Sequence, residues 1–486
     1  MAKLKNIIKQ LSSRDFQAIH DSLIDSSADK SAYLLKAMRE RQLSDTKIMQ
    51  ELGVNTNAYY TLRSRLNQKI EEYLLQQMES PRTDILKKVA NINEIIFTKK
   101  KAIAIATLKK LEKELLDYDL SNELTIVYKS LKKLHINSPD HFSYSQLYNR
   151  HVAYTLAVDK AEDILAEYFK KYGYYTLSGE GTDKLELTLL LKELSNVKDL
   201  YESHRLYVYH SCVNIFHRLF VDMEDDNYDN DVEPVEDILD KVQEIFDSYE
   251  LDSIYYHLNL VFEFLKLEYY NHYKVYRKAE RFYEEVNDAA DNLLTNYALY
   301  TYPAQFLVTK MQRHLRLGTE HEMYEESEGM FQDFELDKQD LPTYLTYSIF
   351  RALSCYYVGN YDDASKWLNG LMNETSLKKY PYMLVELKVL LAIQYCMQND
   401  YDLFNQLINS VQRQVRILGK DNCEHILQMT KILKIAISEI KKNKPEKIQA
   451  IIDKFPQTST TYFAPTMLIK RDSNFVNKLC QTEVMS

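Results

Sequence analysis

Residues that interrupt helices are scarce in this sequence. Glycine and proline each occur nine times in 486 residues, and these two residues form many of the tight turns that an all-β fold needs. Their scarcity therefore argues against that class of fold. The sequence also lacks any run of about 18 apolar residues, so we expect no membrane-spanning helix. The first residues, MAKLKNIIKQ, carry charges and no apolar core, so we expect no signal peptide.

Cysteine is also scarce, and its spacing excludes the common cysteine motifs. No two cysteines form a C-x-x-C pair, and their number is odd. Each lies in a helical pattern, which predicts buried, reduced thiols and a cytoplasmic protein. The five residues are Cys212, Cys355, Cys396, Cys423 and Cys480.

The residues that are abundant favour helices. Leu, Lys, Glu and Ala dominate the long segments, and the 39 tyrosines suit helices that are buried on one edge and wet on the other. The net charge of −10 disfavours a purely electrostatic nucleic-acid binder. That charge is uneven, because residues 30–70 contain eight basic and only three acidic side chains. We therefore predict an all-α fold with one basic region near the start of the chain.

Residues 347–371 predict two helices folded back on each other. Gly359 forms the corner with Asn360 and Tyr361, and Ala364 is small where the second helix must approach the first. The run G-N-Y-D-D-A resembles the corner of a tetratricopeptide repeat, in which a Gly-x-Tyr-x-x-Ala pattern joins two helices. Such a hairpin buries its apolar face only by stacking on further copies of itself.

Further corners and second-helix positions repeat along the C-terminal half. Gly318, Gly359 and Asn399 stand at matching corners, 41 and 40 residues apart. Ala279 and Phe404 occupy the second-helix position that Ala364 has in its hairpin. The resemblance implies an α-solenoid of tetratricopeptide-like hairpins over residues 83–455, with residues 456–486 as a C-terminal cap or tail.

Residues 1–80 predict a separate small helical domain. Within it, IMQELGVNTNAYYTL (residues 48–62) resembles the helix-turn-helix of bacterial regulators: Leu52-Gly53-Val54 match the turn and Asn55 matches the cap of the second helix. Met49 departs from the family pattern, which usually has Ala there. The resemblance implies that the second helix contacts DNA. The residues that would lie near base edges are Thr56, Asn57, Tyr60, Thr61 and Ser64. The residues that would lie near phosphates are Arg63, Arg65 and Lys69. The alternative is a packed helical hairpin with a solvated basic face.

An acidic stretch, DDNYDNDVEPVE, begins at residue 225 and matches the order of oxygen ligands in an EF-hand calcium loop. Asn230 stands where that loop usually has Gly, and Pro234 is unusual there. The alternative is an acidic connector between helices. The candidate calcium ligands are Asp225, Asn227, Asp229, Asp231, Glu233 and Glu236.

No motif for catalysis is present in the sequence. It contains no H-E-x-x-H motif, no zinc-spaced Cys/His cluster and no recognisable nucleophile motif. We therefore expect no enzymatic activity and no cofactor. The histidines, including His204, His217 and His314, are expected to bond to tyrosine or to the backbone. An aromatic run between residues 255 and 283 is expected to lie mostly between helices, with some rings lining a concave groove that binds a peptide.

Together these features resemble bacterial regulators in which a helix-turn-helix precedes tetratricopeptide-like repeats that sense a peptide or protein. The first hypothesis is therefore a non-enzymatic regulator that binds a protein or peptide in its solenoid groove and DNA through its N-terminal segment. The second is an interaction scaffold without DNA binding, which the overall acidity and Met49 favour. An enzyme is the least supported class, and a homodimer is left open.

Overall fold

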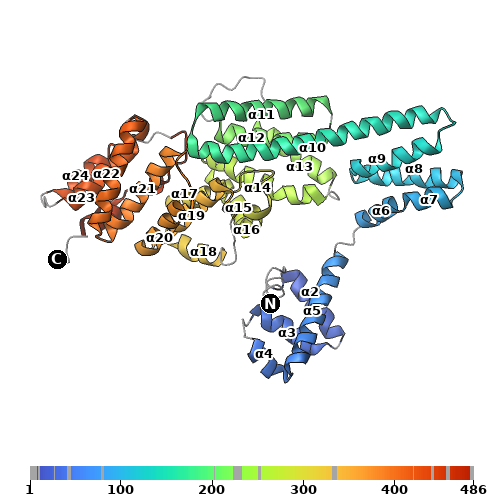
Figure 1. Cartoon of the computed structure of the whole chain (residues 1–486), viewed down its shortest axis with the longest axis horizontal. Helices are drawn as coiled ribbons and strands as arrows, with labels where there is room; N and C mark the ends of the chain where they lie inside the picture. The colour runs from blue at the N-terminus through green and yellow to red at the C-terminus, as the bar shows by residue number, and fades with distance from the viewer. Residues whose placement is uncertain are drawn as a thin grey trace. The chain divides into compact units, whose positions relative to one another are not determined.

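The computed structural model (Figure 1) describes residues 8, 11, 13–26, 28–40, 45–77, 81–201, 203–222, 233–249, 253–330, 337–419, 421–438, 443–455 and 460–481. These residues form 24 α-helices and two short 3-10 helices, and no strand occurs among them. The predicted all-α fold is confirmed. Among the same residues, no helix combines the length and the apolar composition needed to cross a membrane.

The chain divides into two compact units, residues 1–152 and 153–486. The helices of the first unit are α2 (Ser13–Asp25), α3 (Asp29–Glu40), α4 (Asp45–Leu52), α5 (Thr56–Gln77), α6 (Pro81–Ala90), α7 (Ile92–Thr98), α8 (Lys101–Asp117), α9 (Ser121–Leu134) and the first part of α10 (Asp140–Ser178). The domain boundary predicted near residues 80–83 stays a prediction.

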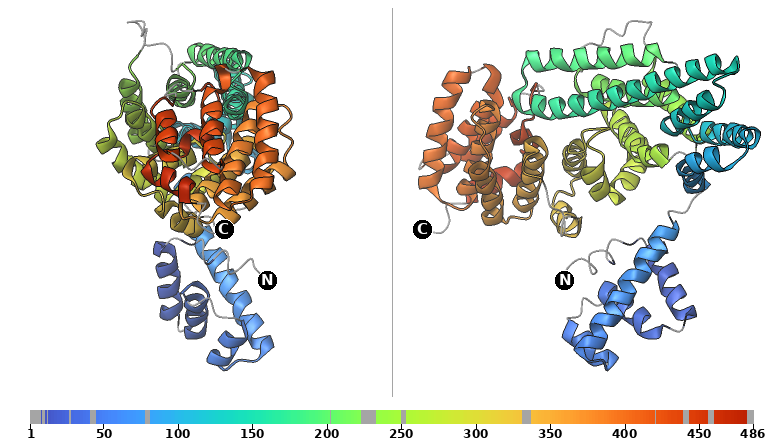
Figure 2. Two further views of the ribbon diagram at one scale, coloured as in Figure 1. Left: turned by 90° about the vertical axis from the view of Figure 1, so that its left-hand side faces the viewer. Right: turned by 45° about the vertical axis from the view of Figure 1, so that its right-hand side comes forward.

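The second unit continues with paired helices. They are α11 (Gly181–Leu200), α12 (His204–Phe220), α13 (Val235–Ser248), α14 (Ser253–His272), α15 (Tyr276–Asp288), α16 (Ala290–Asn296), α17 (Gln305–Leu317), α18 (Glu322–Met330), α19 (Leu341–Tyr357), α20 (Tyr361–Glu374), α21 (Pro381–Met397), α22 (Tyr401–Leu418), η1 (Asp421–Cys423), α23 (Glu424–Ile437), α24 (Lys444–Ile452), η2 (Pro465–Leu468) and α25 (Ser473–Gln481). Helices α10 and α11 run antiparallel side by side in this unit (Figures 1 and 2), and Lys160 pairs with Glu193 across them at 2.9 Å.

Two separate apolar cores lie within the first unit. One joins α2, α3, α4 and α5, and its fully buried side chains include Leu34, Ile48 and Tyr59. The other joins α6 to α9 around Leu108 and Leu131. Helices α3 and α5 carry their apolar residues at helical spacing on one face, which explains why they pack against each other with polar residues outside.

The corners of the helical hairpins in the second unit share one backbone conformation. Gly318, Gly359 and Asn399 have φ angles of 76°, 82° and 61°. This left-handed region costs glycine nothing and asparagine little, which explains the residue types at the three predicted corners. Lys274, between α14 and α15, adopts the same conformation with φ 58°, although it is neither a glycine nor an asparagine.

Behind these corners the helices are covered on almost every side. Helix α19 buries 14 of its 17 residues and α21 buries 12 of 17. The three predicted second-helix positions are buried: Ala279 is 1% exposed, and Ala364 and Phe404 are 0% exposed. At two of these positions a small alanine lets the second helix approach the first, whereas Phe404 fills the same place with a large buried ring. The packing of the second unit is therefore compatible with a helical repeat.

The segment 460–481 packs into the core of the last repeats. Both carboxylate oxygens of the fully buried Glu386 are used: Oε1 lies 2.5 Å from His425 Nε2, and Oε2 accepts from the backbone N–H of Thr466 at 3.0 Å. The Tyr357 hydroxyl donates to the carbonyl of Leu468 at 2.6 Å. These bonds fasten the C-terminal segment across the repeat helices.

The thiols and histidines lie largely where their patterns predicted. Four of the five cysteines are buried and Cys480 is half-buried. His217 Nδ1 bonds to the Tyr168 hydroxyl at 2.9 Å, and His204 Nδ1 bonds to Tyr255 at 2.5 Å. His314 bonds to the carbonyl oxygen of Thr319. The predicted bonding of these histidines to tyrosine or backbone is confirmed.

Candidate functional site

The candidate site of the second unit is a groove along α14 and α16, which we call the α14–α16 groove. Two cavities of about 510 and 350 Å³ open there, and both are lined by His257, Asn292 and Tyr297. Clefts of this size accommodate small ligands or short peptide segments. The remaining lining residues are Gln243, Phe246, Asp247, Ile254, Tyr255, Tyr256, Leu258, Asn259, Leu260, Glu263, Glu285, Ala289, Asn296 and Tyr300.

The apolar part of this groove combines buried side chains of the core with one exposed aromatic ring. Leu258 and Tyr297 are almost fully buried and form the floor, while the ring of Tyr256 is 77% exposed. An exposed aromatic ring beside a buried apolar floor gives an apolar side chain of a ligand two surfaces to contact. Burial raises the pKa of Tyr297, so its phenol keeps its proton.

The polar part consists of side-chain amides. Asn259, Asn292 and Asn296 all line the groove and are exposed. Asn296 Nδ2 donates to Asn292 Oδ1 at 2.6 Å, a bond between residues four apart that orients both amides. An asparagine amide offers donors and an acceptor, as a peptide unit does, so such groups match the backbone of an extended peptide.

The rim of the α14–α16 groove is acidic. Asp247 and Glu285 line it and are exposed, whereas Glu263 lies deeper and pairs with Lys266 at 2.9 Å. Among the residues that the structure describes, no lysine or arginine lines either cavity. Complementary charge would attract a ligand that carries a basic group.

The predicted aromatic run divides between core and surface. Tyr255, Phe262 and Phe264 are at most 2% exposed and lie in the core, whereas Tyr256 and Tyr273 are exposed. Tyr255 and Tyr256 line the larger cavity. The asparagines of α16 were missed at the sequence level; their only signal is the spacing of Asn292 and Asn296 four residues apart.

A third cavity, of about 430 Å³, lies among α18, α19 and α20. Several of its charged groups are paired within the protein: Lys366 pairs with Asp363 at 2.9 Å, and Glu374 accepts from Lys338 and Tyr344, each at 2.7 Å. A ligand would have to displace these bonds, so this cavity is less suited to binding than the α14–α16 groove.

In the first unit, a tight turn joins α4 to α5 at the predicted helix-turn-helix. Gly53 has φ 60° at the corner, and the Val54 N–H donates to the Met49 carbonyl at 3.1 Å. Asn55 Oδ1 accepts from the backbone N–H of Ala58 at 2.8 Å and so caps α5. Met49 packs, half-buried, against the core that α2 to α5 share, where the family usually has a smaller residue.

The predicted DNA-contacting residues lie on two sides of α5. Thr61, Ser64 and Arg65 are exposed and share one face, because they are three or four residues apart. Arg63 and Lys69 are half-exposed and flank the face that Tyr59 and the other apolar residues bury. The side chains of Thr56, Asn57 and Tyr60 lie outside the described residues. DNA contact by this helix stays a prediction.

Most of the predicted calcium loop lies outside the described residues, including Asp225, Asn227, Asp229 and Asp231. Of the remaining two candidates, Glu233 is exposed and its carbonyl accepts from Arg218 Nη1 at 2.6 Å. Glu236 is exposed in the first turn of α13. Calcium binding therefore stays a prediction.

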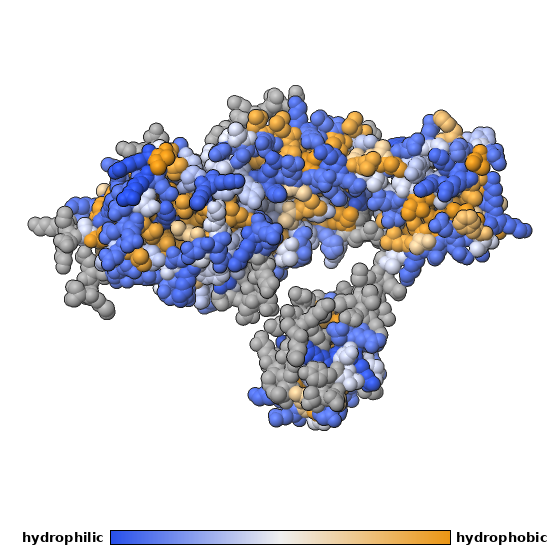
Figure 3. Space-filling view, in the orientation of Figure 1, coloured by the Kyte–Doolittle hydropathy of each residue, from blue (hydrophilic) through white to orange (hydrophobic). Residues whose placement is uncertain are grey.

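Hydrophobic side chains also reach the surface of the second unit over α11 (Figure 3). Leu185 and Leu189, four residues apart on that helix, are 60% and 57% exposed. An apolar face of this kind is compatible with a homodimer, which stays a prediction.

Comparisons of the chain with family models, curated proteins and solved structures found no match.

Proposed function

We propose that this chain is a non-enzymatic helical-repeat regulator that binds an extended peptide segment in the α14–α16 groove. The observation that carries the proposal is the combination, in one groove, of an apolar floor, three exposed asparagine amides and an acidic rim. The amides match a peptide backbone, the floor takes an apolar side chain, and the rim favours a basic residue. The ligand class is therefore a peptide that carries both apolar and basic side chains.

The test is a binding screen with fluorescently labelled peptides of mixed apolar and basic sequence, measured by polarisation on the full chain. We expect peptides that bind to lose affinity when their basic residues are replaced by acidic ones. Asn292→Ala should weaken binding by about tenfold, since a lost pair of hydrogen bonds costs about 1–2 kcal/mol. The matched control is Asn409→Ala, which removes an exposed asparagine from α22, outside the groove. Equal affinities for the two variants would contradict the proposed site.

We further propose that α5 binds DNA through its exposed face and its flanking basic residues. Support comes from the local excess of basic side chains in residues 30–70 and from the capped corner at Gly53 and Asn55. One of these basic residues serves the domain itself, because Arg39 bonds to the Leu11 carbonyl at 3.0 Å. Arg63, Arg65 and Lys69 on α5 are the proposed electrostatic contacts with phosphates.

The test is retention of the full chain on duplex DNA at low and high salt. The double change Arg63→Glu and Arg65→Glu should abolish retention, and salt should weaken binding by the wild type. The control is Arg413→Glu with Arg416→Glu on α22, which makes the same change in net charge on exposed residues of the second unit. If the wild type binds no DNA even at low salt, the alternative of an interaction scaffold without DNA binding stands, and the net charge of −10 favours it.

A further inference from the structure

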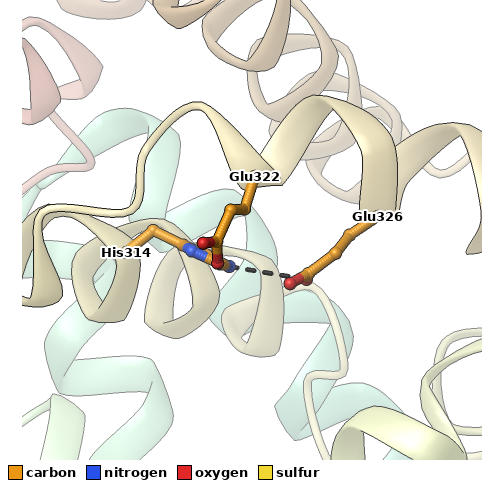
Figure 4. A group of neighbouring side chains, drawn as sticks. All are labelled: His314, Glu322 and Glu326. Atoms are coloured by element: carbon orange, nitrogen blue, oxygen red, sulfur yellow. Dashed lines mark ion pairs between the residues drawn. The ribbon is translucent and has the colours of Figure 1, made fainter.

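A cluster that neither proposed function uses lies between α17 and α18 (Figure 4). His314 from α17 and two carboxylates of α18, Glu322 and Glu326, offer ligand atoms that all lie within 4.8 Å of one another. Because the two glutamates are four residues apart on one helix, their side chains share a face. Figure 4 shows that this face meets the ring of His314.

The turn after α17 holds the His314 ring and selects its tautomer. Gly318, at φ 76°, reverses the chain so that the carbonyl oxygen of Thr319 lies 3.1 Å from His314 Nδ1. The carbonyl only accepts, and the Thr319 hydroxyl, 2.9 Å from Nδ1, can accept as well, so a proton on Nδ1 satisfies both contacts and leaves the lone pair of the neutral ring on Nε2. The side chain is 0% exposed, and Nε2 makes no hydrogen bond. Histidine ligands of metal ions are commonly held in this way by a backbone carbonyl.

The spacing at Nε2 fits a metal ion better than a hydrogen bond. The distance from His314 Nε2 to Glu326 Oε2 is 3.4 Å, longer than the usual N–H···O range of about 2.7–3.2 Å. Two ligands of a tetrahedral zinc ion, with bonds of about 2.0–2.1 Å, are about 3.4 Å apart. Glu322 is exposed and free to rotate toward the same point.

We propose that His314, Glu322 and Glu326 bind one zinc ion, with water as the fourth ligand. One imidazole and two carboxylates suit this metal, and three protein ligands leave one position of the tetrahedron for water. The ion would join α18 to α17.

Lys310 competes with the zinc ion for the carboxylate of Glu326. Its fully buried side chain forms an ion pair with Glu326, and Nζ also donates to Asn287 Oδ1 at 2.7 Å. Because the ammonium and zinc compete for one carboxylate, removal of the ammonium strengthens zinc binding. A purely structural ion pair makes the opposite prediction, since loss of Lys310 would then only destabilise the fold.

The test is zinc binding by the full chain, measured by competition with a chromogenic chelator, together with thermal melting in zinc and in EDTA. We expect the wild type to melt at a higher temperature in zinc. His314→Ala and Glu322→Gln should weaken zinc binding by about tenfold or more, and Lys310→Met should strengthen it several-fold. Since Glu322 is exposed, its variant tests the site even if His314→Ala fails to fold.

The controls are two exposed neighbours that lie outside the cluster, His321→Ala and Glu325→Gln. Both should keep the affinity of the wild type. Identical melting of the wild type in zinc and EDTA would overturn the proposal. It would also be overturned if His321→Ala weakened zinc binding as much as Glu322→Gln, or if Lys310→Met lost the response to zinc.

Discussion

Two helix corners in this chain follow the same local rule in different surroundings. Gly53, between α4 and α5, has φ 60°, and Gly359, between α19 and α20, has φ 82°. After each glycine an asparagine caps the next helix: Asn55 Oδ1 accepts from Ala58 N–H at 2.8 Å, and Asn360 Oδ1 accepts from Asp363 N–H at 3.3 Å. A glycine in the left-handed conformation followed by a capping asparagine therefore starts a new helix in both units.

The helices beside the two corners have different environments. Helix α19 buries 14 of its 17 residues, whereas α5 buries Tyr59, Leu66 and Ile70 on one side and exposes Arg65 on another. A helix covered on all sides can only support the fold, while a helix with one apolar stripe leaves a face for a partner. Corner residues thus predict where a helix begins. The width of its apolar surface predicts whether the helix is buried in the core or leaves a face for a partner.

The largest expected difference between the two regions concerns buried charge. Glu386→Ala should destabilise the second unit by about 3–5 kcal/mol, because it leaves His425 and the Thr466 N–H without their partner in the core. Glu51→Ala, which removes the acceptor of the Tyr33 hydroxyl on the exposed side of α4, should cost about 1 kcal/mol or less. Urea denaturation followed by circular dichroism measures both. Equal losses would show that the fastening of segment 460–481 contributes little.

The next difference concerns alanines in the first turns after the two corners. Ala364 is 0% exposed against α19, so Ala364→Leu should overpack this contact and cost about 1–3 kcal/mol. Ala58 is exposed on α5, so Ala58→Leu should change stability by less than about 0.5 kcal/mol. Hydrogen exchange of the Ala364 variant should rise first across residues 310–410, since repeats contact mainly their neighbours. A uniform rise over the whole chain would contradict the repeat packing.

The parts of the fold that sequence reasoning could predict are local. Gly318, Gly359 and Asn399 were identifiable because a left-handed corner restricts the residue type. Lys274 adopts the same conformation without a glycine or asparagine signal, so its corner is set by the packing of α14 and α15 and could not be read from residue type.

The candidate sites depend on contacts between distant residues, which no local pattern specifies. The α14–α16 groove brings Tyr256 and Asn259 of α14 near Asn292 of α16, more than 30 residues later in the chain. Glu386 meets the N–H of Thr466, 80 residues away. The individual residue types were visible in the sequence, but their proximity follows only from how the helices stack.

A smaller and equal effect is expected at the two corner glycines. A Cβ at Gly53 or Gly359 would meet no atom within 4 Å, so the cost of valine there is the left-handed backbone alone. Gly53→Val and Gly359→Val should each lose about 1–2 kcal/mol in chemical denaturation. Gly359→Asn should lose less, because Asn399 occupies the equivalent corner with φ 61°. A neutral Gly359→Val would contradict the conformation at this corner.

The smallest expected change in stability is at the exposed face of α5. Arg65 is exposed, and Arg65→Glu should shift the free energy of unfolding by less than about 0.5 kcal/mol. If this face contacts phosphates, the same change should weaken DNA retention and reduce the slope of log affinity against log salt by about one. Arg413→Glu, an exposed change of equal charge on α22, should leave that slope unchanged. Unfolding of the Arg65 variant would mean that this face supports the fold as α19 does. Equal salt slopes for the two variants would mean that the uncovered face of α5 does not bind DNA through Arg65.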